Sequence, residues 1–386
     1  MADGADILVI GGGIAGASAA AELAAHGRVV LLERESQPGY HTTGRSAAMF
    51  TLSYGNRVIR TLARAAMDFL HEPPPGFATA PLVRQRGLML FGREDQLARV
   101  RAHHEEVRAL SPEAALIDAE AVRRLVPAFR PGYAAAAAYE EAAREIDVHA
   151  LHGGFLRLLR ARGGRIVTDA DVTALARRGG VWEATTAAGA FAAPVVVNAA
   201  GAWADDVAAL AGAAPLGLAP LRRTVVVFEA PVETRVDGWP MAVDIDEDFY
   251  FKPDAGRLFA SPADETPSPP CDAQPEEIDI ATALDRIGRA TTLAPRRLVA
   301  RWAGLRTFAP DRTPVAGFDG DVEGFVWLAG QGGYGIKTSP SLARAVAGLV
   351  AHGDLPEDQR ALGLTAAALS PRRLRARPRG DGTSRG

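Results

Sequence analysis

The chain has 386 residues, enough for two domains, and 48% hydrophobic and 23% charged residues are typical of a globular protein. Its formal net charge of −3 excludes a bulk electrostatic attraction to nucleic acid or to an anionic membrane. A single cysteine, Cys271, excludes a disulfide framework, and the eight histidines show no metal-ligand spacing, so we expect no metal site. No apolar run reaches the ~18 residues of a membrane span and no signal pattern is present. We expect a cytoplasmic protein, with peripheral contact to the inner membrane left open.

The N-terminus predicts a βαβ unit. A short apolar strand leads through a glycine-rich turn into an alanine-rich helix, and a second apolar strand ends at Glu33. Gly11, Gly13 and Gly16 have the spacing of a dinucleotide fingerprint, in which glycines permit a tight turn, close approach to a pyrophosphate and helix packing. The helix start offers free N–H groups to phosphates. Glu33 lies where a carboxylate accepts hydrogen bonds from a ribose, which disfavours a 2′-phosphate and therefore NADP.

The rest of the chain predicts two styles of structure. An apolar strand at 194–198 runs into small residues up to Trp203, and a last buried strand at 325–329 precedes a glycine loop and a helix expected to start near Pro340. Between them, short β segments from Arg222 to Phe259 indicate an antiparallel sheet and a second domain. Other helices are expected over residues 15–25, 58–70, 94–110, 148–159 and 278–290, and other strands over 88–91, 165–167, 172–176, 181–185 and 301–306.

Together these stretches resemble the FAD-dependent D-amino acid oxidase family, which also holds glycine and sarcosine oxidases. The resemblance covers nearly the whole chain, and its motifs are the N-terminal fingerprint, the loop Thr43–Ser46, the run Asn198–Trp203 and the terminal glycine loop. Within the family, the bacterial D-arginine dehydrogenases have similar stretches, which are here residues 37–41, 44–48, 221–223, 249–256, 302–306 and 331–336.

The resemblance implies an α/β fold, with a Rossmann-like FAD-binding domain of the D-amino acid oxidase type and an α+β substrate domain built on an antiparallel sheet. We expect a discontinuous FAD-binding domain over residues 1–87, 147–220 and 300–371, and a substrate-binding domain over residues 88–146 and 221–299. The basic segment 372–386 is expected to be disordered.

The resemblance implies one noncovalent FAD. Some amine dehydrogenases of the superfamily attach FAD to a histidine in a similar setting, here His41-Thr-Thr-Gly44, but the D-arginine dehydrogenases hold a similar histidine beside free FAD. Lys337 falls where wider family members place a cation near the flavin N1–C2=O edge; the alternative is a solvent-facing lysine. The implied cofactor-binding residues are Gly11, Gly13, Ile14, Ala15, Gly16, Glu33, Arg34, Thr42, Thr43, Gly44, Arg45, Ser46, Ala48, Val172, Ala200, Gly201, Trp203, Gly304, Arg306, Gly332, Gly333, Tyr334, Gly335, Ile336, Lys337 and Thr338.

Five residues resemble those that hold the substrate. Arg223 and Arg306 match the carboxylate-binding arginines, and a guanidinium fork suits a carboxylate. Arg223 is chosen over its neighbour Arg222 by this match alone. Tyr54 and Tyr250 match the tyrosines that donate to the same carboxylate, and Gly333 matches the position whose carbonyl oxygen faces the substrate amine.

The side-chain end of the pocket is expected to be uncharged. D-Arginine dehydrogenases place a glutamate against the substrate guanidinium, and the matching residue here is Leu88. Asp244 or Asp246 could still supply a carboxylate from a neighbouring strand. The pocket residues expected by the same match are Met49, Thr51, Leu88, Met241 and Val243.

The implied reaction is hydride transfer from the substrate Cα to flavin N5, which gives an imino acid that water hydrolyses to a 2-oxo acid and ammonia. Sarcosine-oxidase-like members use a lysine on a substrate-domain strand to speed the reaction of reduced flavin with oxygen, and the matching strand Gly256–Ala260 has only Arg257 as a cation. We therefore expect a D-amino acid dehydrogenase that favours apolar side chains and passes electrons to a quinone or another acceptor. One alternative is an enzyme for N-methyl or cyclic secondary amino acids such as sarcosine or proline.

A further alternative, from another class, is a flavin-binding protein that is not catalytic or that takes part in RNA modification. The absence of a basic patch disfavours RNA. The two arginines and two tyrosines disfavour a catalytically empty fold.

Overall fold

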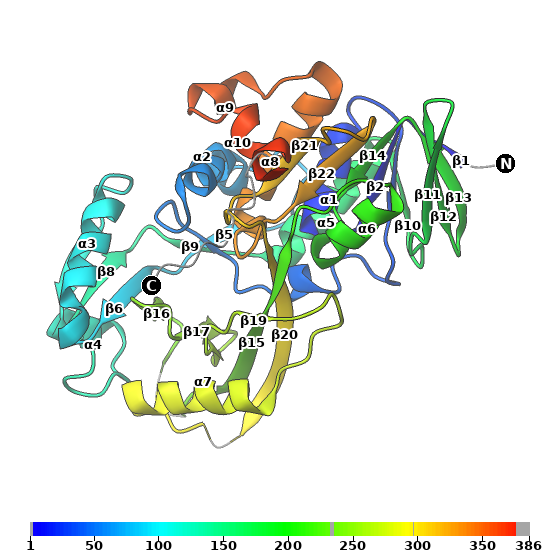
Figure 1. The fold of residues 1–386 in the computed structure, drawn as a ribbon. Helices are drawn as coiled ribbons and strands as arrows, with labels where there is room; N and C mark the ends of the chain where they lie inside the picture. Colours follow the sequence, from blue (N-terminus) through cyan, green and yellow to red (C-terminus); the bar gives the residue numbers. More distant parts are fainter. Residues whose placement is uncertain (1–2, 232–234, 296, 376–386) are drawn as a thin grey trace, which may run out of the picture.

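The computed structural model describes residues 3–231, 235–295 and 297–375. A six-stranded sheet in the order β10-β3-β2-β14-β22-β21 forms one half of the molecule (Figure 1). Its neighbouring strands are parallel except for β21, which is antiparallel to β22. The strands are apolar runs because both faces of the sheet are covered. The strands are β2 Ile7–Ile10, β3 Val29–Leu32, β10 Arg165–Val167, β14 Val195–Asn198, β21 Val315–Phe318 and β22 Phe325–Ala329.

Helices cover one face of this sheet, and a smaller sheet covers the other. α1, α2, α5 and α8 share one apolar core with the first face. The four-stranded sheet β1-β13-β12-β11 and α6 share a second core with the opposite face. These elements are α1 Ile14–Leu23, α2 Arg57–His71, α5 Val148–Ala161, α6 Ala204–Leu210, α8 Gly335–His352, β1 Asp3–Gly4, β11 Ala174–Arg178, β12 Val181–Thr186 and β13 Gly189–Ala193.

A nine-stranded sheet forms the other half. Its order is β19-β15-β18-β17-β16-β6-β8-β7, with β20 also paired to β15. Neighbours are antiparallel except β6 and β16, where the two chain segments of this half meet. α7 packs on the outer face, seen below the sheet in Figure 1. The bounds are β6 Leu88–Gly92, β7 Ala115–Asp118, β8 Ala136–Glu140, β15 Ala219–Glu229, β16 Met241–Asp244, β17 Tyr250–Asp254, β18 Arg257–Ser261, β19 Thr266–Pro267, β20 Leu298–Phe308 and α7 Glu277–Ala290.

Shorter elements join the halves and complete the fold. β4, β9 and β5 form a three-stranded sheet between them. No helix in the described ranges is long and apolar enough to cross a membrane. The bounds are β4 Met49–Phe50, β5 Val83–Gln85, β9 Arg144–Ile146, α3 Leu97–Arg108, α4 Ala119–Leu125, α9 Glu357–Ala361, α10 Ala366–Leu369, α11 Arg372–Arg375 and the 3₁₀ turns Thr42–Arg45, Glu94–Gln96 and Gly201–Trp203.

The expected fold class is confirmed, but two boundaries differ from the sequence prediction. α8, the helix expected to start near Pro340, begins at Gly335. Pro340 has no N–H to donate inside the helix, and the hydroxyl of Ser339 instead donates to the carbonyl of Ile336 (3.0 Å). β20 lies in the nine-stranded sheet through its pairing with β15, whereas the sequence predicts that the FAD-binding domain resumes at residue 300.

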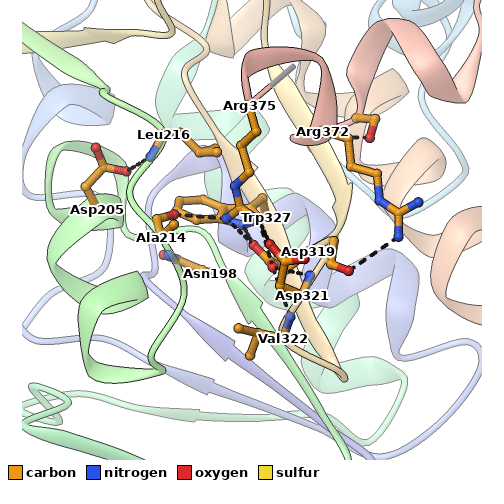
Figure 2. A network of polar contacts seen from close by, with 12 residues as sticks. Asn198, Asp205, Ala214, Leu216, Asp319, Asp321, Val322, Trp327, Arg372 and Arg375 are labelled. Carbon is orange, nitrogen blue, oxygen red and sulfur yellow. Dashed lines mark hydrogen bonds and ion pairs between the residues drawn. The ribbon is translucent and has the colours of Figure 1, made fainter. Parts of the chain in front are cut away.

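The start of the C-terminal segment also differs. Arg372–Arg375, expected to be disordered, form α11, because Arg373 pairs with Asp311 (2.8 Å) and Arg375 with Asp319 (2.6 Å). Figure 2 shows the side chain of Arg375 pointing toward Asp319. Residues 376–386 lie outside the described ranges.

Candidate active site

Two adjoining cavities lie between the two halves. The dinucleotide cavity runs along the first βαβ unit, and the sheet cavity lies under the nine-stranded sheet. Ile14, Thr42, Thr43, Gly332 and Gly335 line both, so one elongated ligand can extend from one cavity into the other.

The glycine turn is shaped for close approach. Gly11 has a φ of +102°, and a Cβ there would lie 2.5 Å from the carbonyl oxygen of Ala199. A Cβ on Gly16 would overlap the carbonyl oxygen of Gly11, so this glycine lets α1 pack on the turn. The amides of Gly13 and Ala15 line the cavity and donate to no group within the described ranges. They fit the phosphates of a dinucleotide.

Glu33 closes the same turn at the end of β3. Its carboxylate accepts hydrogen bonds from the amides of Gly12 (2.7 Å) and Glu35 (2.9 Å), and the side chain lines the dinucleotide cavity. Burial raises the pKa of Glu33, against the effect of these two main-chain bonds. Glu33 therefore supports the glycine turn in addition to the ribose contact that its position suggests.

Most of the expected cofactor residues line one cavity or the other. The guanidinium of Arg34 stacks over the indole of Trp203, 4.7 Å from its centroid. Arg45 lines the sheet cavity, but its guanidinium donates to the carbonyl of Ala303 (2.8 Å) and pairs with Asp272 (2.5 Å). The expected residues that line neither cavity are Gly16, Gly44, Tyr334 and Thr338.

His41 lies in the dinucleotide cavity and not in the sheet cavity. Its Nε2 is 2.9 Å from Glu35, and its ring centroid is 4.8 Å from that of Trp203. Its buried Nδ1 has no partner in the described part of the chain. This placement supports a noncovalent role, which remains a prediction.

All the expected substrate residues line the sheet cavity. For the members that lie on β6 and β16, the two-residue period of a strand explains the grouping. Along β6 and β16, Leu88, Leu90, Met241 and Val243 face the cavity, whereas Met89 and its alternate neighbours enter the core under α7.

Arg306 presents a guanidinium to this cavity from β20. The guanidinium of Arg306 has no hydrogen bond or ion pair to any group that the structure describes. A Cβ on Gly333 would lie 3.0 Å from the guanidinium carbon of Arg306, so glycine leaves the space that this side chain fills. An uncommitted guanidinium in a cavity is suited to a carboxylate.

Arg222 and Arg223 point to opposite faces of β15. Arg222 pairs with Asp279 (3.0 Å) on α7, whereas Arg223 lines the sheet cavity. The Nε of Arg223 donates to the carbonyl of Asp264 (2.8 Å), and its Nη2 lies 3.3 Å from Glu265. These bonds orient the guanidinium. Its Nη1 is uncommitted among the described groups and can serve a ligand.

Two tyrosines and an unexpected acid complete the polar end. The hydroxyl of Tyr54 donates to Glu247 (3.2 Å), and burial raises the pKa of this phenol, so Tyr54 stays protonated. Tyr250 is buried, with its ring 5.9 Å from the guanidinium carbon of Arg223. Glu247 lies in the turn between β16 and β17 with a φ of +58°. The sequence analysis missed Glu247, and its place in a hairpin turn facing the site was the available signal.

Asp244 and Asp246 do not supply a cavity carboxylate. Asp244 pairs with Arg93 (3.4 Å) and Asp246 with Arg99 (3.1 Å). Strand alternation turns Asp244 away because Val243 faces the cavity. Within the described ranges, Glu247 is the one carboxylate lining the sheet cavity.

Lys337 is buried at the start of α8 and lines the sheet cavity. Its ammonium donates to the main-chain carbonyls of Thr51 (3.0 Å) and Tyr54 (2.6 Å). The solvent-facing alternative is therefore wrong. The contact with the flavin edge stays a prediction.

The glycine turn and the two adjoining cavities suit an extended dinucleotide. Residues 6–349 match the family model described as DAO, FAD dependent oxidoreductase. The chain belongs to this family of FAD-dependent oxidoreductases, and its cofactor is FAD.

Several known proteins are similar over nearly their whole length. Hydrogen cyanide synthase subunit HcnC of Pseudomonas aeruginosa is 25% identical over 92% of this chain and 94% of its own. The structure of glycine oxidase from Geobacillus kaustophilus has a TM-score of 0.79 at 22% identity, covering 90% of this chain and 95% of that one. The structure of L-proline dehydrogenase from P. horikoshii has a TM-score of 0.81 at 19% identity, covering 97% and 99%.

Proposed function

We propose that the protein is a D-amino acid dehydrogenase that converts D-amino acids with apolar side chains to 2-oxo acids and ammonia. The observation that carries this proposal is the sheet cavity, which has an apolar wall at one end. At the other end lie the guanidinium of Arg306 and the Nη1 of Arg223, neither of which has a partner among the described groups. The preference for the D configuration is inferred only from the sequence stretches that resemble those of the D-arginine dehydrogenases.

The polar end suits an amino acid carboxylate. Arg306 and Arg223 supply charged donors, and the hydroxyls of Tyr54 and Tyr250 supply neutral ones. Charge-assisted hydrogen bonds of this kind are about twice as strong as neutral ones. By family resemblance, the carbonyl of Gly333 accepts a hydrogen bond from the substrate amine. Together these groups orient the Cα–H bond.

FAD, when bound, supplies the two-electron chemistry, so the protein has to position the substrate and exclude water. The amine must be neutral when the hydride leaves. The carbonyl of Gly333 can accept a hydrogen bond from the amine N–H, but it cannot take the proton that an ammonium group has to lose.

The wall formed by Leu88, Met49, Met241 and Val243 selects the side chain. An apolar side chain gains roughly 25 cal/mol per Å² that it buries there. An unpaired cationic side chain loses several kcal/mol on burial. Glu247 is exposed, and its carboxylate already accepts a hydrogen bond from Tyr54. We therefore expect a higher kcat/KM for D-Leu, D-Met and D-Phe than for D-Arg and D-Lys.

A second candidate is the oxidation of cyclic or N-methyl amino acids. The similarity to L-proline dehydrogenase favours it, because a secondary amine can use the same carboxylate-binding groups.

The test is anaerobic bleaching of the holoenzyme with D-Leu, D-Met, D-Phe, D-Arg, sarcosine and proline, followed by kcat/KM for D-Leu and D-Arg. We expect bleaching by apolar D-amino acids and a higher kcat/KM for D-Leu. Bleaching only by sarcosine or proline would establish the second candidate instead.

Leu88→Glu should raise kcat/KM for D-Arg and lower it for D-Leu, whereas the matched control Leu88→Met should leave the order unchanged. A destabilised fold could not reverse the order. Equal or better turnover of D-Arg by the unaltered enzyme would contradict the assignment of Leu88 to the side-chain end.

A further inference from the structure

The two lysines of the chain are both buried. The sequence has 43 lysine and arginine residues, of which only Lys252 and Lys337 are lysines, and their exposed fractions are 4% and 3%. Lys252 pairs with Glu145. Lys337 has no carboxylate within ion-pairing distance in the described ranges, and its two hydrogen bonds there go to main-chain carbonyls.

These carbonyls belong to one short turn. Lys337 donates to Thr51 (3.0 Å) and to Tyr54 (2.6 Å), so a single ammonium joins both ends of the segment 51–54. The rings of Tyr54 and Tyr334 each lie 5.6 Å from the ammonium. Because an ammonium is compact and has three donors, it fits between two carbonyls where a planar guanidinium would not.

A buried carboxylate binds the side chains of the same turn. Glu140, 5% exposed on β8, accepts hydrogen bonds from the hydroxyls of Thr51 (2.8 Å) and Ser53 (2.6 Å). The amide of Ser53 in turn donates to the hydroxyl oxygen of Thr51 (3.0 Å). Lys337 and Glu140, two buried groups of opposite charge, therefore both bind the turn without forming an ion pair with each other. Burying such charges is costly, which argues for a role beyond filling space.

We infer that Lys337 and Glu140 are positioning residues that hold the turn 51–54 and thereby fix the Tyr54 hydroxyl at the sheet cavity. The role of Tyr54 on the substrate carboxylate rests on the proposed function. The positioning itself does not.

The hydrogen bonds of Lys337 should survive its deprotonation. Burial lowers the pKa of Lys337 to about 7, with Glu140 opposing the shift. The neutral amine still has two N–H groups, one for each carbonyl. The effect of removing Lys337 should therefore be the same on both sides of neutral pH, unlike that of removing an acid–base group.

The direct test is amide hydrogen exchange of the holoenzyme in the segment 49–56. Lys337→Met should speed exchange there by about tenfold, because it removes the hydrogen bonds to the carbonyls of Thr51 and Tyr54. The matched control Lys252→Met removes the other buried ammonium and should leave exchange at 51–55 unchanged. If Lys337→Met does not fold, Thr51→Val removes the Glu140 contact and should have the same effect on exchange. Unchanged exchange in these variants overturns the proposal.

A double-mutant cycle separates this role from direct contact with the flavin. Lys337→Met should lower kcat/KM by roughly tenfold, mainly through KM, and by less than about twofold in a Tyr54→Phe background. An equal loss in both backgrounds, or a lost limb of the pH profile, would overturn it. If no amino acid bleaches the flavin, the proposed function fails, and the exchange experiment still decides the positioning.

Discussion

At the scale of single residues, Glu33 joins two tasks that are usually considered separately. Its carboxylate fastens the glycine turn through the amides of Gly12 and Glu35 and faces the dinucleotide cavity. Losing it therefore loosens the glycine turn and removes the carboxylate that we propose for the ribose contact.

Glu33→Ala should weaken FAD binding by at least about tenfold, which is 1.4 kcal/mol. Equilibrium dialysis against free FAD measures this change, and Glu22→Ala, an acid on α1 that does not line the cavity, is the control. On denaturation of the unaltered protein, FAD should separate from the chain. Yellow colour retained by the precipitated polypeptide would contradict noncovalent binding and implicate His41.

At the scale of elements, the cations on β18 and on its neighbouring strand are relevant to the choice of electron acceptor. Arg257, the cation on this strand, is exposed and pairs with Glu229 (3.2 Å) on β15. On the adjacent strand, Lys252 is buried but pairs with Glu145 and does not line the sheet cavity. Neither cation lines the sheet cavity, which supports the proposal of a dehydrogenase.

We expect the reduced enzyme to react with an artificial quinone at least about tenfold faster than with dissolved oxygen. Stopped-flow reoxidation after anaerobic reduction measures both rates, and peroxide release provides an independent check. Fast peroxide formation stoichiometric with substrate would show an oxidase, and would mean that Lys337 or another group replaces the missing lysine.

At the scale of the whole molecule, one buried carboxylate ties the C-terminal segment to the first sheet (Figure 2). Asp319 accepts hydrogen bonds from Arg375 (2.6 Å) and Trp327 (2.8 Å) and from the amides of Asp321 and Val322. Burial opposes ionisation, but these hydrogen bonds outweigh it and lower the pKa of Asp319 to about 2. The stabilisation is fully present above the unfolded-state pKa and is lost as the pH falls through the folded-state pKa.

Asp319→Asn should lower the free energy of unfolding at pH 7 by about 2 kcal/mol, and the deficit should be constant down to about pH 5 and shrink below about pH 4. Denaturant unfolding at saturating FAD measures it. The control is Asp285→Asn, which breaks an exposed i,i+4 pair with Arg289 and should cost less than about 0.5 kcal/mol. An equal cost for the two variants would contradict the role of the network.

Much of this protein follows from local sequence. The glycine fingerprint, the acid at Glu33 and the long apolar strands are set by residues close together in the chain, since turn geometry and strand periodicity are local properties. The same periodicity separates Arg222 from Arg223 and turns Leu88 and Met241 to one face.

Tertiary structure decided the rest. The hairpin turn that brings Glu247 to Tyr54, the grip of Lys337 and Glu140 on the turn 51–54, and the pairing of Arg375 with Asp319 each join residues more than 50 positions apart. No local pattern encodes such contacts, because they depend on how the two sheets pack and on which charges that packing buries. Arg372–Arg375 illustrate this point, since their basic composition predicts disorder until buried partners are brought to them.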